Sequence, residues 1–199
     1  VALGFDLIVG TGLGLVAGYV GGKIDSILMR IADILFAYPA LLLALVVAGT
    51  LGRGIDKAML AIGIVYAPQM ARIIRSSVLS IKEMEYIEAE HALGASNWRI
   101  VFKHVLPNSL APLIVYSTLM LATAILDAAA LGFLGVGAQP PSPEWGLSLS
   151  IARKYLVTGA WWAATFPGIA ILLSVISLNM LGDGLRDALD PRLKGGSKI

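Results

Sequence analysis

Side chains suited to catalysis or metal binding are scarce in this sequence. It contains two histidines, His91 and His104, and no cysteine. Both histidines lie in the polar segment 81–107 between apolar stretches, so they predict no metal site inside a membrane. No Ser/His/Asp arrangement, paired catalytic carboxylates or G-x-x-x-x-G-K-[ST] phosphate loop is recognisable. We expect a chain that is not an enzyme and binds no metal or cofactor of its own.

One acidic residue stands apart because it borders an apolar run. Asp127 follows the uncharged stretch 105–126, and a carboxylate inside a bilayer is costly and often lines a pathway. The irregular segment 132–146 comes next, and non-helical backbone at membrane depth must face protein or water. We therefore place Asp127, Phe133 and Gln139 at a pathway or gate. A hydrated helix end is the alternative for Asp127.

The composition indicates what surrounds these residues. Of the 199 residues, 57% are hydrophobic and 14% are charged, whereas a soluble domain has about 45–50% apolar residues, glycine included, and about 25% charged ones. The polar residues are too few to cover a soluble globule, and the apolar ones too many for a disordered chain. A net charge of +2 is too small for a nucleic-acid-binding surface. The composition predicts an integral membrane protein.

Five stretches are long and apolar enough, or nearly so, to cross a bilayer, which takes about 20 residues per helix. We expect an all-α, polytopic transmembrane helix bundle that forms a single domain over residues 1–199. The predicted spans are 5–22, 33–51, 58–80, 108–128 and 160–181. Each of four prolines falls within a span and is expected to kink it, either statically or in a moving bundle. These are Pro39, Pro68, Pro112 and Pro167.

The basic residues set the orientation. Of fifteen Lys and Arg, only Arg53, Lys57, Arg153 and Lys154 fall on the side of the N-terminus. The other eleven fall on the opposite side, which is therefore predicted to be cytoplasmic, together with the C-terminus and the segment 81–107. No signal-like segment precedes the first span. An outside N-terminus then predicts a sixth helix upstream of it.

Two further features bear on how the helices pack. Glycines recur every four residues and form one stripe of the first span: Gly10, Gly14, Gly18 and Gly22. Such a stripe lets another helix approach closely. A nucleotide-binding glycine loop is the alternative, but the G-x-G-x-x-G spacing and a βαβ context are missing. Asp33, beside Arg30, is expected to form a local ion pair or to lie at an interface.

The segment 81–107 is long for a connection between two spans, and long loops are usually functional. Residues 83–93 favour a helix that ends at Gly94, and Ser96 can cap a second short helix that runs to about His104. This pattern predicts a docking element for a partner, with an amphipathic hairpin on the membrane surface as the alternative. The candidate docking residues are Glu88, Ala89, Glu90, His91, Ala92, Leu93, Gly94, Ala95, Ser96 and Arg99.

Part of this segment is similar to a known motif. Glu88-Ala89-x-x-x-x-Gly94, followed by Leu106-Pro107, resembles the EAA loop of permease subunits in bacterial ABC importers. The usual pattern is E-A-A, three residues, G, nine residues, then I-x-L-P, and the glycine and L-P spacings match. Glu90 replaces the usual second Ala, and His104 replaces the usual Ile.

Other segments extend the resemblance over nearly the whole chain. Residues 131–146 resemble the outer loop of dipeptide/oligopeptide-type permeases, and residues 181–193 resemble their ending. The segment 19–25 and Met29-Arg30 also match. The similarity is greatest to the second permease, the "C" subunit, of dipeptide, oligopeptide and nickel importers.

The resemblance implies a type I ABC importer permease in a bacterial or archaeal cytoplasmic membrane. Such a subunit forms half of a translocation pathway with a second, homologous permease, and works by alternating access. It implies two ATPase subunits, which carry ATP and Mg and dock on the 81–107 loop, and an extracytoplasmic binding protein that delivers di- or oligopeptides. The segment 132–146 is then expected to form an outer gate or part of the surface that receives this binding protein. Membrane lipid is a further partner, and nucleic acid is not. The alternatives are import of nickel or another small solute, or a self-contained secondary transporter or channel, which would need inverted repeats and its own ion sites. A membrane-embedded enzyme is a third alternative, and the lack of a recognisable catalytic set counts against it.

Overall fold

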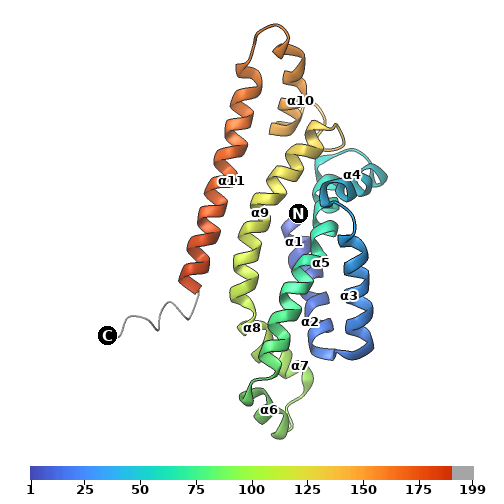
Figure 1. Cartoon of the computed structure of the whole chain (residues 1–199), viewed down its shortest axis with the longest axis vertical. Helices are drawn as coiled ribbons and strands as arrows, with labels where there is room; N and C mark the ends of the chain where they lie inside the picture. The colour runs from blue at the N-terminus through green and yellow to red at the C-terminus, as the bar shows by residue number, and fades with distance from the viewer. Residues whose placement is uncertain (190–199) are drawn as a thin grey trace, which may run out of the picture.

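The computed structural model describes residues 1–189, which form helices joined by short connections, with no strand in that range (Figure 1). The first span is a continuous rod of α1 (Ala2–Phe5), a π-helical turn η1 (Asp6–Gly10) and α2 (Thr11–Val20). The remaining elements are α3 (Gly22–Phe36), α4 (Ala40–Leu51), α5 (Ile55–Lys82), α6 (Glu85–Ala92), α7 (Asn97–Ile100), η2 (Val101–Val105), α8 (Leu106–Asn108), α9 (Leu110–Phe133), α10 (Trp145–Leu156) and α11 (Trp162–Leu189). The protein therefore has the all-α architecture that the sequence predicted.

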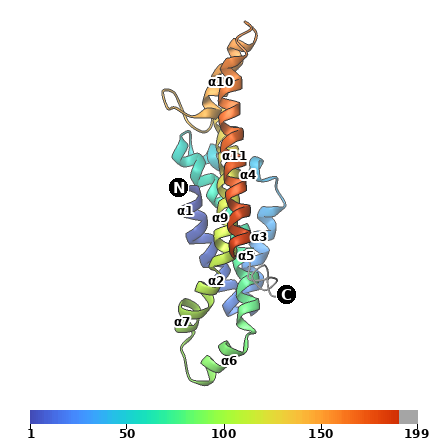
Figure 2. The ribbon, with the colours of Figure 1, turned by 90° about the vertical axis from the view of Figure 1, so that its left-hand side faces the viewer.

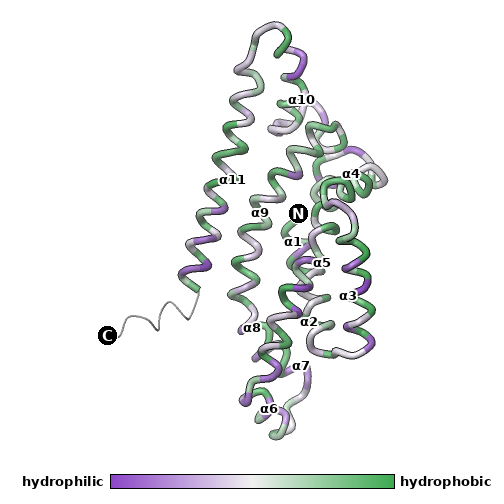
Figure 3. The backbone as a smooth tube through the Cα atoms, viewed as in Figure 1, coloured by the Kyte–Doolittle hydropathy of each residue, from purple (hydrophilic) through white to green (hydrophobic). Residues whose placement is uncertain are grey.

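Among the described residues, four helices are long and apolar enough to cross a membrane: Ala2–Val20, Ile55–Lys82, Leu110–Phe133 and Trp162–Leu189. Taken together, α3 and α4 make a fifth candidate, although their axes meet at 95°. Apolar residues dominate the middle of the bundle, and hydrophilic ones gather around α6 (Figure 3). The predicted spans 5–22, 58–80, 108–128 and 160–181 therefore correspond to helices of the structure.

The predicted span 33–51 is wrong in its bounds. The helix before it begins at Gly22, and the chain breaks at Ala37–Pro39 before α4 begins. Pro39 is the N-cap of α4, with φ −57° and ψ 126°, because proline supplies no N–H to a preceding helix and pushes the residue before it out of the helical conformation. Helix α3 carries charges near both ends and in its middle, so it contains no uncharged stretch long enough to predict a span.

Helix α5 is the centre of the bundle. It packs against the first span, α4 and α9, while α11 packs on α9 and α10 at one edge (Figures 1 and 2). Pro68 lies inside α5 and Pro167 inside α11, as expected. The buried core runs along α5 and includes Ile62, Met70, Ile74 and Val78, each at most 1% exposed. The spans are therefore assembled on one central helix.

The glycine stripe is the surface by which the first span meets α5. A Cβ at Gly14 would lie 2.6 Å from the carbonyl oxygen of Ala71, and one at Gly18 would lie 2.8 Å from Cβ of Val78. A Cβ at Gly10 would meet Met70 at 2.6 Å. No Cβ fits at such distances, so glycine is required for this close approach. The packing interpretation of the stripe is confirmed for these three glycines. It is wrong for Gly22, because the first span ends at Val20 and Gly22, at φ +59°, begins α3, where a Cβ would meet nothing within 4 Å.

Candidate functional site

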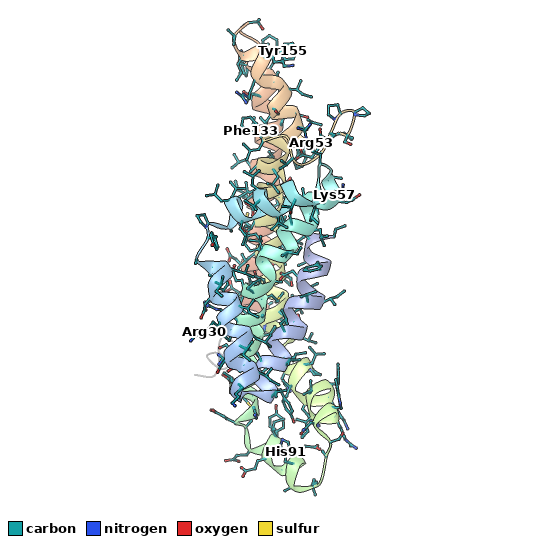
Figure 4. All side chains as sticks on the ribbon, turned by 90° about the vertical axis from the view of Figure 1, so that its right-hand side faces the viewer. Arg30, Arg53, Lys57, His91, Phe133 and Tyr155 are labelled. Carbon is teal, nitrogen blue, oxygen red and sulfur yellow. The ribbon has the colours of Figure 1, made fainter. Side chains whose placement is uncertain are left out.

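A hairpin of α6 and α7 projects from one end of the bundle (Figures 1 and 2). We call residues 85–100 the α6–α7 hairpin. Figure 4 places His91 in it, at the end opposite Arg53 and Lys57. At its tip Leu93 is 84% exposed, an unusual position for a large apolar side chain. The hairpin thus presents an apolar tip away from the spans.

Backbone hydrogen bonds fix the turn of the hairpin. Gly94 has φ +80°, and its N–H donates to the carbonyl of His91 at 3.0 Å. The N–H of Ala95 donates to the carbonyl of Glu90 at 3.0 Å. These two bonds form a Schellman motif, which needs a residue that tolerates positive φ. The expected glycine C-cap is confirmed.

The second arm begins at the expected N-cap. The N–H of Arg99 donates to Oγ of Ser96 at 3.4 Å. Helix α7 ends at Ile100, and the chain continues through the π-helical η2 and through α8, which contains Pro107, to α9. The second arm therefore extends past His104 and joins the span after it with little interruption.

Side chains from both arms hold the hairpin together. Ile87 of α6 and Ile100 of α7 are buried, at 1% and 0% exposed. His104 Nε2 lies 3.3 Å from Glu90 Oε1, and Asn108 Nδ2 donates to the hydroxyl of Tyr86 at 3.3 Å. The hairpin is thus an ordered element.

Most of the candidate docking residues are free on the surface of the described chain. Glu90 and Ala95 are half-buried, since Glu90 faces His104. The exposed candidates are Glu88, Ala89, His91, Ala92, Leu93, Gly94, Ser96 and Arg99. They surround the turn, so the structure brings the whole predicted set to one place.

The sequence did not single out the residues that tie the hairpin to the first span. The hydroxyl of Tyr19 donates to Oδ1 of Asn97 at 3.1 Å. Lys82 Nζ donates to the carbonyl of Tyr19 at 2.9 Å and lies 5.5 Å from the centre of its ring. Asn97 and Tyr19 are 78 residues apart, and no local pattern predicts such a pair.

Two arginines of α5 hold α3 near the same end. Arg75 donates to Asp25 through Nε at 2.5 Å and through Nη2 at 2.6 Å, a bidentate pair. Arg72 pairs with Asp33 and lies 4.3 Å above the ring of Phe36. Asp33 does form an ion pair, but its partner comes from α5 and not from the neighbouring Arg30. The pairs fasten the charged helix α3 to the centre of the bundle.

At the opposite end, the candidate pathway residues have separate contacts. The hydroxyl of Tyr66 on α5 donates to Oδ2 of Asp127 on α9 at 2.8 Å. Phe133, at the end of α9, lies 5.5 Å from the guanidinium of Arg153. Gln139 Nε2 donates to the carbonyls of its own loop, including that of Gly137 at 3.1 Å. Asp127 is therefore the candidate that bridges two spans.

The loop after α9 is fixed by Glu144. Its carboxylate accepts from the N–H groups of Gly146 at 2.8 Å and Leu147 at 2.7 Å, and so caps α10. Gly146 lies so close to Ala129 that no side chain would fit. The segment 132–146, which the sequence marked as irregular, is therefore an ordered connection between α9 and α10. Helix α10 itself was not expected.

Within residues 1–189, no group of three or more His, Cys, Asp or Glu side chains is placed to hold a metal ion. The C-terminus and residues 190–193 of the matched ending lie outside the described residues.

The arrangement defines a multi-span membrane protein with an ordered hairpin at one end, and comparison with known proteins assigns it to a family. Residues 10–195 match the family described as "Binding-protein-dependent transport system inner membrane component". The chain belongs to this family, whose members are multi-pass proteins of the inner membrane.

Relatives with similar sequences are permeases. The chain is 54% identical over 188 residues to the dipeptide transport system permease protein DppC of Alkalihalophilus pseudofirmus, covering 94% of this chain and 62% of that protein. It is 49% identical over 192 residues to the di/tripeptide transport system permease protein DppC of Pseudomonas aeruginosa, covering 96% and 63%. It is 47% identical over 188 residues to the glutathione transport system permease protein GsiD of Pectobacterium atrosepticum, covering 94% and 62%. The chain thus spans less than two thirds of the length of these relatives.

A solved structure has the same fold. A chain of the MetNI methionine ABC transporter in an inward-facing conformation matches with a TM-score of 0.76. The match covers 95% of this chain and 89% of that chain, at 21% sequence identity. The helices described above are therefore arranged as in that chain of the MetNI transporter.

Proposed function

We propose that this chain is a non-catalytic permease subunit of an ATP-driven importer and forms half of a pathway for short peptides. The observation that carries the proposal is the α6–α7 hairpin, which is ordered, projects from one end of the bundle and exposes an apolar tip at Leu93. A transporter that worked alone would have no need of such a surface. Membership of a binding-protein-dependent transport family supports the same function over a channel or secondary transporter.

The hairpin is the docking surface for an ATPase on the cytoplasmic side. Leu93 and the small residues beside it fill a groove on the ATPase, while Glu88 and Arg99 make polar contacts around it. Internal contacts such as that between Glu90 and His104 make the hairpin stiff enough to transmit movement. ATP and Mg are held by the ATPase subunits, which work as a pair. The orientation is supported by the excess of Lys and Arg on the side of the bundle where the hairpin lies.

The opposite end faces the binding protein. Asp127, Phe133 and Gln139 lie at or just after the end of α9 nearest this side, where peptide enters the pathway that two permease subunits form between them. Asp127 offers a carboxylate to the α-ammonium group of a peptide, and Phe133 offers an apolar surface. The ordered loop 134–144 is part of the outer gate.

Peptides are favoured as the substrate over nickel. The relatives described above are named for dipeptides, di/tripeptides and glutathione. The chain has two histidines, and both lie in or next to the hairpin rather than along the spans. Uptake of labelled di- and tripeptides into vesicles that contain the complete transporter, in competition with nickel, tests this choice. Uptake of nickel without uptake of peptides would overturn it.

The docking assignment is tested with Leu93→Asp. Leu93 is 84% exposed, so the substitution has little effect on folding but places a charge in the contact with the ATPase. Co-purification of the ATPase and ATP-driven uptake should both fall by at least about tenfold, the equivalent of about 1.4 kcal/mol. Gly94→Asp, which also strains the turn at φ +80°, should uncouple transport while the subunit stays inserted in the membrane.

The matched control is Val157→Asp. Val157 is 92% exposed and lies in the connection between α10 and α11, at the other end of the molecule. This variant should keep the ATPase bound. Equal co-purification in the Leu93→Asp and Val157→Asp variants would show that the hairpin tip is not the docking surface.

A further inference from the structure

An apolar groove separates the first span from the second arm of the α6–α7 hairpin. It has a volume of about 440 Å³. Its two walls come from α2 and from the α7–η2 helix, and the residues that matter here are Gly12, Val16, Val20, Trp98, Val101 and Phe102. The rings of Trp98 and Phe102 are stacked, with their centres 5.5 Å apart and their planes 9° apart. The groove therefore has a rigid aromatic wall on the hairpin side.

This groove is open to the surroundings of the bundle. Trp98 is 74% exposed and Phe102 is 55% exposed, and across the groove Val16 and Val20 are 45% and 56% exposed. These four side chains form an apolar surface at the end of a membrane span, where α7 lies beside the end of α2 (Figures 1 and 2). Aromatic residues concentrate at this depth of a bilayer.

A smaller, polar pocket adjoins the groove and shares Tyr19, Val20 and Asn97 with it. It has a volume of about 280 Å³, and Lys82 and His91 complete its lining. Lys82 is held there by its bond to the carbonyl of Tyr19. The pocket therefore offers a positive charge and hydrogen-bonding groups directly beside an apolar groove.

We propose that the groove and pocket together bind a phospholipid with an anionic headgroup from the leaflet at the hairpin end. An acyl chain lies in the groove against Trp98 and Phe102, and the headgroup phosphate lies in the pocket near Lys82. The charges favour this occupant, since Lys103 is also exposed and follows Phe102 directly in the sequence. Each basic residue near a membrane surface attracts anionic lipid by about 1 kcal/mol.

The site has a structural consequence for the hairpin. Tyr19 and Asn97, which are bonded to each other, line both the groove and the pocket. A lipid bound there contacts the first span and the second arm at once and holds the arm to the membrane. The exposed tip at Leu93 does not line the groove, so it stays available to a protein partner.

The first test uses the absence of cysteine from the chain. Phe102→Cys provides the one cysteine within residues 1–199 for a nitroxide spin label, and any cysteine elsewhere in the complete transporter is replaced before it is reconstituted into vesicles that contain phosphatidylglycerol. A label in lipid collides with oxygen more than with a water-soluble nickel complex. We expect a label at Phe102→Cys to collide more with oxygen. A label at Leu93→Cys, measured without the ATPase, should collide more with the nickel complex. A label at Phe102→Cys that favours the nickel complex, or that neither reagent reaches because protein covers it, would overturn the proposal.

The second test fills the groove. A Cβ at Gly12 meets nothing within 4 Å, so Gly12→Leu projects into the groove without disturbing the bundle. Gly49→Leu on α4 is the matched control, since Gly49 is equally open. Native mass spectrometry of the transporter from phosphatidylglycerol nanodiscs should show loss of a retained anionic lipid in Gly12→Leu and not in Gly49→Leu.

Lys82→Gln then tests the headgroup. The preference for phosphatidylglycerol over phosphatidylcholine should fall by about fivefold, which corresponds to about 1 kcal/mol. Inorganic phosphate added to the transporter should not displace the bound lipid, because it lacks the acyl chain. Equal lipid retention in the parent, Gly12→Leu and Lys82→Gln would refute the site. None of these measurements involves a transported substrate, so they are independent of the peptide assignment.

Discussion

Glu90 Oε1 and His104 Nε2 lie 3.3 Å apart. This contact joins α6, the first arm of the hairpin, to η2, which continues the second arm beyond α7. These are the two positions at which the sequence departs from the usual EAA pattern. In that pattern an Ala and an Ile occupy them. Here the two departures face each other, with the side chains 27% and 19% exposed, respectively. A polar contact thus stands where the usual residues would make an apolar one.

Glu90→Gln should loosen the hairpin. The substitution removes the carboxylate that faces His104, so the contact between the two arms loses its charge on the α6 side. Because neither side chain is fully buried, we expect at most about 1 kcal/mol, or up to about fivefold faster amide exchange in α6. Hydrogen exchange of the complete transporter measures this. Glu88→Gln, at an exposed neighbouring position, should change nothing, and equal exchange in Glu90→Gln and the parent would contradict the prediction.

Features that depend on local sequence could be predicted. The turn at Gly94 needs a residue that tolerates positive φ, and Ser96 is a usual N-cap, so both hairpin arms were placed within a few residues. The glycine stripe could be recognised because residues four apart share one helix face. Its partner, α5, could not be named, since any apolar helix could fill that role.

Features that depend on distant residues were missed. The sequence suggested that Asp33 would act locally beside Arg30, yet it pairs with Arg72 because α3 folds back along α5. Helix α3 is set apart from α4 by the 95° bend at the break before Pro39. A proline in the sequence does not by itself show whether a helix is kinked or broken there. The contact between Tyr19 and Asn97 likewise appears only once the helices are assembled.

Gly14→Ala should destabilise the bundle. The added Cβ would lie 2.6 Å from the carbonyl oxygen of Ala71 and 2.8 Å from Cβ of Ile74, so the first span must move away from α5. Overpacking of this kind costs about 1–3 kcal/mol. Unfolding of the purified subunit by denaturant in detergent measures the loss. Gly12→Ala, where the new Cβ has no neighbour within 4 Å, is the control and should be within about 0.5 kcal/mol of the parent.

Asp6→Val should stabilise the protein. Asp6 is 0% exposed, and neither carboxyl oxygen has a hydrogen-bond partner among the described residues. Burying an unpartnered polar group costs about 1–3 kcal/mol, and apolar replacements of such groups are often stabilising. The same denaturant experiment should show a higher free energy of unfolding for Asp6→Val, and little change for Asp6→Asn, which keeps a polar group there. Destabilisation by Asp6→Val with normal stability of Asp6→Asn would contradict the prediction, because it would mean that the polar group is favourably paired within the subunit.

The two ion pairs between α3 and α5 should differ in strength. Arg75 and Asp25 have side chains 31% and 16% exposed and are joined by two bonds, whereas Arg72 and Asp33 are 48% and 61% exposed. Arg75→Gln leaves a largely buried carboxylate without its partner, and we expect a loss of about 1–3 kcal/mol. Arg72→Gln should cost at most about 1 kcal/mol because both partners of that pair are more exposed and one bond joins them. A loss in Arg72→Gln equal to that in Arg75→Gln would contradict the ranking that burial predicts.

Asp127 and Tyr66 allow the charge at the proposed pathway to be separated from the hydrogen bond. Tyr66 donates to Asp127 Oδ2 at 2.8 Å, and both side chains are half-buried. Asp127→Asn keeps an oxygen that can accept this bond but removes the charge. Tyr66→Phe removes the bond and keeps the charge. The pair of variants therefore tests two roles at one position.

If Asp127 attracts the α-ammonium group of a peptide, Asp127→Asn should lower ATP-driven peptide uptake by about tenfold, the equivalent of about 1.4 kcal/mol. The variant should remain assembled with its ATPase. Tyr66→Phe should reduce the free energy of unfolding by about 1 kcal/mol while uptake falls much less. If instead Asp127 is a hydrated helix end, Asp127→Asn will transport peptides at the parent rate. These outcomes are distinguished by measuring peptide uptake into proteoliposomes of each variant and dividing it by the amount of assembled transporter. A variant that folds poorly gives less assembled transporter, but its uptake per assembled transporter is unchanged.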